Sequence, residues 1–216
     1  MEPTAQTSLV NIGTWVTAGK DILVGLSAVV AAFFAYRGLS AWRKELKGKS
    51  EYQLAKDVLK SVYKVREAFK HVRHIAIYQY EYPEDMLDHH GHLKKENDYK
   101  GTAHVYENRW KKMDEAFGEL EEHHLDAQVE WGPKFQDKIV KLRSCRSELL
   151  VTIQQMLERK KNPREEALSK VKEAAEERSV LYHIGSDSKH DKFTPQIEES
   201  IDEFEKWLRP HIQHKG

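Results

Sequence analysis

The chain has 216 residues, of which 39% are hydrophobic and 32% charged, and its formal net charge at pH 7 is zero. This length fits one membrane segment plus one domain of ordinary size, and the charged fraction argues against a protein that crosses the membrane many times. The balanced charge argues against a general nucleic-acid coat. A single cysteine, Cys145, excludes an internal disulfide.

The first apolar segment runs from Ile22 to Tyr36, fifteen residues without a charged side chain. As a helix it would cover about 22 Å, which is short of the roughly 30 Å hydrocarbon core, so a membrane segment must extend beyond it. Trp15 and Tyr36 would then stand about 31 Å apart and mark the two aromatic belts. We therefore predict an outer or interfacial segment over 1–19 and a transmembrane helix over 20–42.

Two other kinds of segment share this apolar pattern. A secretory signal peptide carries positive charge before its apolar run, whereas here the basic cluster follows it, at Arg37, Arg43, Lys44, Lys47 and Lys49. A buried core helix would suit fifteen residues, but it does not account for the basic cluster or the flanking aromatic residues. The positive-inside rule then predicts a single-pass protein of the inner membrane, with the N-terminus outside and a cytoplasmic domain over 43–216.

Small residues recur along one face of the predicted span. Starting from Asp21, the residues Gly25, Ala28, Ala32 and Ala35 follow at intervals of four, three, four and three. Small residues let helices pack closely in lipid, and an ionisable residue within a span is a functional candidate. We predict that this seam mediates self-association, and that Asp21 lines a cation pathway if the seam encloses a pore. The alternative is that alanine is simply common in membrane helices and that Asp21 reaches outward to the interface.

The rest of the chain predicts an all-α fold, a helical bundle with a long first helix. That helix is expected over 50–77 with a coiled-coil-like apolar repeat, and further helices over 104–129, 134–160, 163–182 and from Thr194, with Thr194 and Pro195 as the cap. Loops are expected over 78–103 and 185–192. The residues expected to face inward on the first two helices are Ala55, Val58, Val62, Val65, Phe69, Val72 and Ala76, then Val105, Trp110, Met113, Phe117, Leu120, His124 and Ala127.

Positive charge is concentrated near the start of the cytoplasmic part. Between Arg37 and Arg73 there are eleven Lys and Arg against four Asp and Glu. Anionic lipid headgroups account only for the residues next to the membrane, because the Debye length is about 8 Å. The more distant cations either bind an anionic ligand or pair with later acidic residues, and pairing is the preferred alternative. The candidate ligand-binding residues are Lys64, Arg66, Lys70, Arg73, Arg109, Lys138 and Lys141.

No hydrolase elbow, phosphate loop or dinucleotide fingerprint is present in the sequence. We therefore predict that the protein is not an enzyme and uses no cofactor. A histidine-rich loop contains His89, His90 and His92 beside Asp88. It lacks the fixed ligand spacing of a zinc site, so we predict a solvated polar loop and no metal.

The stretch WRKELKGKSEYQLAKDVLKSVYKVREAFKHVR, from Trp42 to Arg73, follows the predicted span. Together they resemble small bacterial membrane proteins that act as transmembrane effectors of anti-phage defence. One such system, the Hailong type, pairs a nucleotidyltransferase with a channel controlled by single-stranded DNA oligomers. The resemblance implies a homo-oligomeric channel or membrane-disrupting effector, whose partners are its own copies, membrane lipid, a nucleotide or single-stranded DNA ligand, and a soluble protein. The alternative is a membrane-tethered adaptor that recruits a soluble protein and forms no pore.

Overall fold

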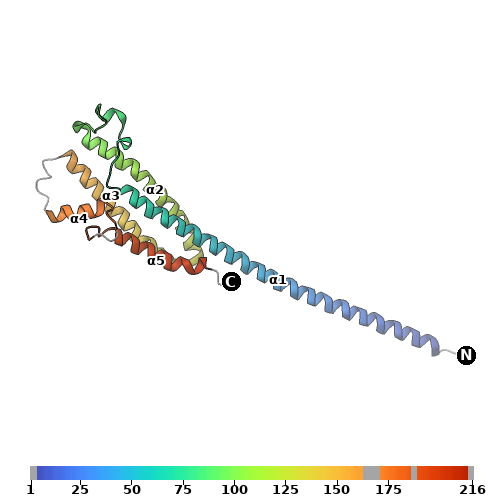
Figure 1. Cartoon of the computed structure of the whole chain (residues 1–216). Coiled ribbons are helices and arrows are strands. Elements are labelled where there is room, and N and C mark those ends of the chain that lie inside the picture. Colours follow the sequence, from blue (N-terminus) through green and yellow to red (C-terminus); the bar gives the residue numbers. More distant parts are fainter. Residues whose placement is uncertain (1–3, 163–170, 186–188, 214–216) are drawn as a thin grey trace. The chain divides into compact units, whose positions relative to one another are not determined.

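A computed structural model describes residues 4–162, 171–185 and 189–213 (Figure 1). In this part of the chain the α-helices are α1 (Thr4–Val72), α2 (Asp98–Trp131), α3 (Val140–Lys161), α4 (Val171–Leu181) and α5 (Thr194–Ile212). Short 3-10 helices lie at Gln79–Glu81, Glu84–Met86, Lys95–Asn97 and Pro133–Ile139. These residues form no β-strand, and one isolated bridge joins Leu87 to Leu93. The all-α fold expected from the sequence is confirmed.

The chain divides into two units, Met1–Ser50 and Glu51–Gly216. The first unit consists, where described, of α1 alone. One helix among the described residues, counted from Leu23, is long and apolar enough to cross a membrane, and no residue of its apolar window is buried. Large side chains such as Leu23, Phe33 and Phe34 are more than half exposed. A candidate membrane helix is therefore present where the sequence predicted one.

The second unit, called the bundle below, builds one hydrophobic core. Helix α3 contacts α2, α4 and α5, and Figure 1 shows α2, α3 and α5 extending alongside one another. From α1 the core takes every apolar position predicted up to Val72. Each fully buried large apolar side chain contributes about 1.5–3 kcal/mol. The other main core residues are Met113, Phe117, Leu120, Phe135, Ile139, Leu142, Leu149, Ile201, Phe204 and Leu208.

The first helix ends earlier than the sequence predicted. We expected a helix to residue 77 with Ala76 facing inward, but α1 ends at Val72 and Ala76 is exposed. The carbonyl oxygens of His74 and Ala76 accept hydrogen bonds from the guanidinium of Arg109, at 2.7 Å each. These bonds from α2 replace the helical ones and redirect the backbone, which apolar periodicity alone does not reveal.

Other boundaries also shift. Helix α2 begins six residues before the expected His104, and the segment before α3 is a 3-10 helix, Pro133–Ile139. Trp110, expected inside, is only partly buried. The expected start of the fourth helix at Pro163, and residues 186–188 of the last predicted loop, lie outside the described residues.

Helix α5 begins at Thr194 as predicted, but its N-cap residue is Phe193, whose side chain makes no cap hydrogen bond. The carboxylate of Asp191 accepts bonds from the backbone N–H and the hydroxyl of Thr194, at 2.9 and 2.6 Å. Asp191 therefore supplies the hydrogen-bond acceptor for the first backbone N–H of this helix. Its carboxylate is fixed in the buried site described below.

Candidate functional site

The predicted seam lies on an uncovered face of α1. Gly25, Ala28, Ala32 and Ala35 are exposed, and nothing lies within 4 Å of a Cβ added at Gly25. At 3.6 residues per turn these four residues fall within an arc of about 80°. The side chain of Asp21 lies outside the described residues. The small residues therefore form a narrow strip that is open to a second helix.

The face opposite this strip is bulky. Leu23, Val30 and Phe34 fall on that side at the same helical pitch, and each is at least half exposed. Such a continuous apolar surface is unfavourable in water, and it is the ordinary surface of a helix in lipid. Unit one thus has one face suited to helix packing and another suited to acyl chains.

The surface cations proposed as ligand-binding residues are held by carboxylates. Lys64 forms an ion pair with Glu119 of α2 at 2.5 Å. Arg66 and Lys70 share Glu67, at 3.3 and 3.2 Å. Such exposed pairs contribute little to stability, typically below about 1 kcal/mol. They do, however, offset much of the positive charge that the sequence places along α1.

The two cations predicted on α3 and its approach face α5. Lys141 pairs with Glu203 and lies 3.7 Å from Glu199. The positive charge of Lys138 also acts on Glu203, whose pKa is lowered, first by the hydrogen bond from Lys141. Lys141 therefore links α3 to α5, and Lys138 contributes its positive charge nearby.

Arg73 is buried at the end of α1, with 1% of its side chain exposed. It pairs with Asp191 at 3.0 Å, donates to the Thr194 hydroxyl at 2.8 Å, and lies over the ring of Phe193. It also donates to three backbone carbonyls, those of Ser179, Val180 and Tyr182. Burial alone would raise the pKa of Asp191, but the Thr194 bonds and the Arg73 charge hold it at about 2. The guanidinium thus ties α1 to the end of α4 and the start of α5.

Arg109 is buried in the same way on α2, with 3% of its side chain exposed. It donates to both carboxylate oxygens of Glu81, at 2.6 and 2.8 Å, besides the carbonyls of His74 and Ala76. Burial opposes the charge of Arg109, but Glu81 outweighs it, so the pKa of Arg109 is raised. This arginine fixes the path of the chain between α1 and α2.

The seven candidate cations therefore do not converge on one site. Six of them form ion pairs with carboxylates of the bundle. The guanidinium groups of Arg73 and Arg109 donate their hydrogen bonds to acceptors inside the bundle. This arrangement agrees with the pairing alternative. Their role as ligand-binding residues stays a prediction.

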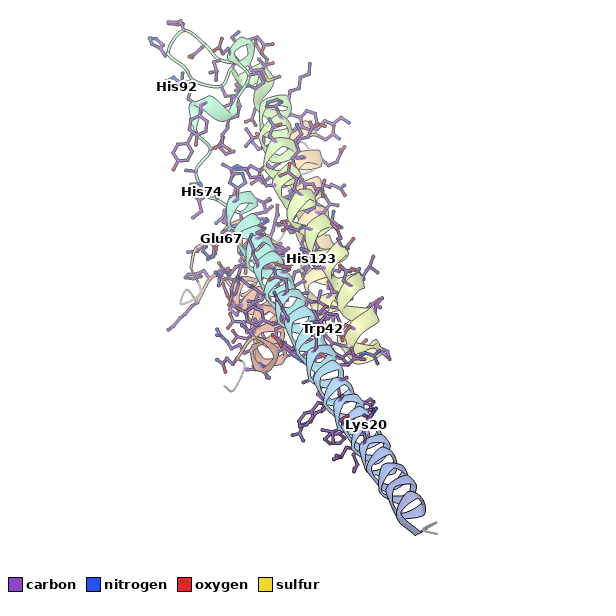
Figure 2. All side chains as sticks on the ribbon, turned by 90° about the vertical axis from the view of Figure 1, so that its right-hand side faces the viewer. Lys20, Trp42, Glu67, His74, His92 and His123 are labelled. Atoms are coloured by element: carbon purple, nitrogen blue, oxygen red, sulfur yellow. The ribbon has the colours of Figure 1, made fainter. Side chains whose placement is uncertain are left out.

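An open cleft of about 650 Å³ lies instead where α1 ends and the following loop crosses α2. From the sequence this segment is expected only to form a loop. The signal that could have identified it is the alternation of tyrosines in YQYEY, residues 78–82, beside the histidines of α1. Figure 2 shows His74 where the chain leaves α1. The cleft is lined by His71, His74, Tyr78, Tyr80, Glu81, Tyr82, Pro83, His104, Val105, Asn108, Arg109 and Lys112.

The histidine-rich loop does not build a metal centre in the described part of the chain. The rings of His89 and His90 lie 3.9 Å apart, and Asp88 accepts bonds from the backbone N–H groups of His90 and His92. Figure 2 shows His92 far out on this loop. Among the described residues no group of three or more His, Cys, Asp or Glu side chains could hold a metal ion.

Comparison with protein-family models, with curated proteins and with solved structures found no match to this chain.

Proposed function

We propose that this chain is a single-pass protein of the inner membrane that self-associates through its span and acts as an ion channel or membrane-disrupting effector. The observation that carries the proposal is the apolar stretch of α1, which no other part of the first unit covers. A soluble protein would bury such a surface, whereas a membrane helix leaves it to lipid.

The basic residues that follow the apolar stretch support the orientation. Its C-terminal side carries a basic cluster of Arg37, Arg43, Lys44, Lys47 and Lys49. The residues before the stretch contain one lysine, Lys20. By the positive-inside rule the bundle is cytoplasmic and the N-terminus is outside. The bundle would therefore meet cytoplasmic ligands and partner proteins.

Self-association is supported by the exposed strip Gly25, Ala28, Ala32 and Ala35. Close packing of small residues is the main source of helix association in lipid. A ring of copies would place Asp21 around the central axis at the outer end, where carboxylates favour cations. Ligand binding to the bundle would gate this assembly, provided that the ligand binds one state better than the other.

The biological setting, anti-phage defence, is proposed on the resemblance of residues 42–73 alone. That resemblance also suggests the partners: a nucleotide or single-stranded DNA ligand and a soluble protein. The bundle supports a signalling role in one respect, since its buried arginines link the end of α1 to α2, α4 and α5. A change in any of these helices has a physical route to α1.

The first test is the mass of the detergent-solubilised full-length protein. We expect a defined oligomer that dissociates in the Ala28→Leu and Ala32→Leu variants, because leucine would hold the helices apart. Ala31→Leu is the matched control, since it makes the same change about 80° from the centre of the strip. A monomeric wild-type protein, or equal effects at Ala31 and Ala32, would refute the seam.

The second test separates a channel from an adaptor. Conductance across a planar bilayer should appear with the wild-type protein and lose cation selectivity with Asp21→Asn. An adaptor that only recruits a soluble protein would give no conductance. Its activity would also survive when the bundle is attached to an unrelated membrane helix.

A further inference from the structure

The cleft between α1, the following loop and α2 holds a ladder of aromatic rings. Tyr78 and Tyr80 stack in parallel, with ring centroids 5.5 Å apart and 5° between their planes. The ring of His74 lies 5.7 Å from Tyr78, on a tilt of 31°. Tyr80 ends the ladder and is 82% exposed, while Tyr78 is 47% exposed. Two neighbouring large aromatic rings thus face solvent without forming part of the core.

This ladder is held in place by the buried arginine of α2. Glu81 accepts a bond from the Tyr78 backbone N–H at 2.9 Å, and its own N–H donates to the Tyr78 carbonyl at 3.0 Å. Arg109 donates two hydrogen bonds to the same carboxylate. The tyrosines are therefore carried on a short turn that Arg109 fixes through Glu81, the last residue of the 3-10 helix. An exposed aromatic surface that is already ordered loses little conformational entropy when it binds a ligand.

The same cleft contains a lysine whose ammonium group has no partner among the described residues. Lys112 lines it one turn beyond Arg109 on α2, and the described part of the chain offers Lys112 no hydrogen bond or ion pair. Arg109 and Glu81 neutralise one another, so Lys112 is the one lysine or arginine of the lining that has no carboxylate partner among the described residues. Its effect is felt at His71, whose pKa is lowered first by burial and then by Lys112.

Stacked aromatic rings beside a free cation match one ligand chemistry. The flat face of a nucleobase can extend an aromatic stack, and a phosphate carries the charge that a lysine binds. A proline-rich peptide also docks on exposed aromatic rings, but it carries no phosphate for the lysine to bind. A cleft of about 650 Å³ is of the size that holds a small-molecule ligand.

We propose that this cleft is a nucleotide-binding site, in which the base stacks on Tyr80 and the phosphate binds Lys112. A free nucleotide and a unit of a single strand share this chemistry. The proposal deepens the proposed function, because it names where the ligand that gates the membrane assembly would bind. Of the seven cations predicted from the sequence, Arg109 lines this cleft, whereas Tyr78, Tyr80, His74 and Lys112 are not among the predicted residues.

Binding is tested with the full-length protein in lipid nanodiscs, using adenosine monophosphate and a single-stranded oligonucleotide of about eight nucleotides as probes. We expect the wild-type protein to bind at least one of the two. Tyr80→Ala should weaken binding about 5- to 150-fold, as expected for loss of one base–aromatic stack. Tyr80→Phe keeps the ring and should bind normally. Because Tyr80 is almost fully exposed, neither change threatens the core.

The matched pair for the phosphate is Lys112→Ala and Lys111→Ala. Both remove one positive charge from the same turn of α2, but Lys111 hydrogen-bonds Asn108 and does not line the cleft. Only Lys112→Ala should weaken binding. For the oligonucleotide it should also reduce the salt dependence of affinity by about 0.7 in the slope of log K against log salt concentration.

Each outcome decides a separate point. Binding of the oligonucleotide alone identifies the source as a single strand, and binding of both probes identifies a nucleotide site open to either. No binding of either probe, or binding that Tyr80→Ala and Lys112→Ala leave unchanged, overturns the site. The membrane proposal is judged separately by the oligomer mass and the conductance, so a protein that binds nucleotide as a monomer refutes the channel and keeps the cleft.

Discussion

Replacing Arg73 by methionine should destabilise the bundle more than any other single charge removal on α1. The change keeps a long side chain but leaves the buried Asp191 carboxylate without its cation, and removing one partner of a buried ion pair costs about 3–5 kcal/mol. It also removes the hydrogen-bond donor of the backbone carbonyls of Ser179, Val180 and Tyr182. Asp191 keeps its bonds from Thr194, so we expect the lower part of that range.

For a protein of this size, 1 kcal/mol corresponds to about 2–4 °C in Tm, so a loss of about 3–4 kcal/mol should lower Tm by about 6–16 °C. The assay is thermal unfolding of the detergent-solubilised full chain, followed by circular dichroism. Arg66→Met is the control, because it removes the same charge from a partly exposed pair on the same helix, at a cost below about 1 kcal/mol. If Arg73→Met loses no more than Arg66→Met, the buried guanidinium does not hold α1 to α4 and α5.

Three further results are expected. Because the pKa of Asp191 is held at about 2, below its usual 3.8, the stability it supplies is complete above about pH 4 and is lost as pH falls through 2; acid titrations of Tm should show a smaller loss in Asp191→Asn. Arg109→Lys cannot reproduce the fork to Glu81, so Tm should drop by several degrees and trypsin should cut the loop after α1 faster, whereas unchanged cleavage would contradict the role given to Arg109. Leu120→Ala in the core should cost about 2–5 kcal/mol, while Leu125→Ala on the exposed side of α2 should cost less than about 0.5, and equal losses in chemical denaturation would contradict the assigned core.

The sequence predicted the all-α class and the core face of α1 because apolar spacing reports directly on burial. Val58, Val62, Val65 and Phe69 recur at three and four residues, and all are buried. The Thr194–Pro195 pair also identified the start of α5. These features depend on neighbours along the chain, which a single sequence displays.

What the sequence did not reveal depends on distant partners. Nothing local distinguishes Arg73 from Arg66 on the basic face of α1, yet one is buried against Asp191 and the other lies at the surface. The early end of α1 likewise requires Arg109, more than thirty residues later. The stack of Tyr78 on Tyr80 depends on a turn that is fixed by that same arginine. The sequence of this segment therefore predicts only an ordinary loop.

The contacts of Arg73 also set an order of events during synthesis. Its partners Asp191 and Thr194 lie 118 and 121 residues further along the chain. At about 5–20 residues per second, the ribosome needs roughly 6–24 s to supply them after Arg73 has been made. In the proposed membrane protein, the apolar part of α1 has left the ribosome long before the bundle can close. Insertion into the bilayer can therefore be completed while the helices that will surround Arg73 are still being translated.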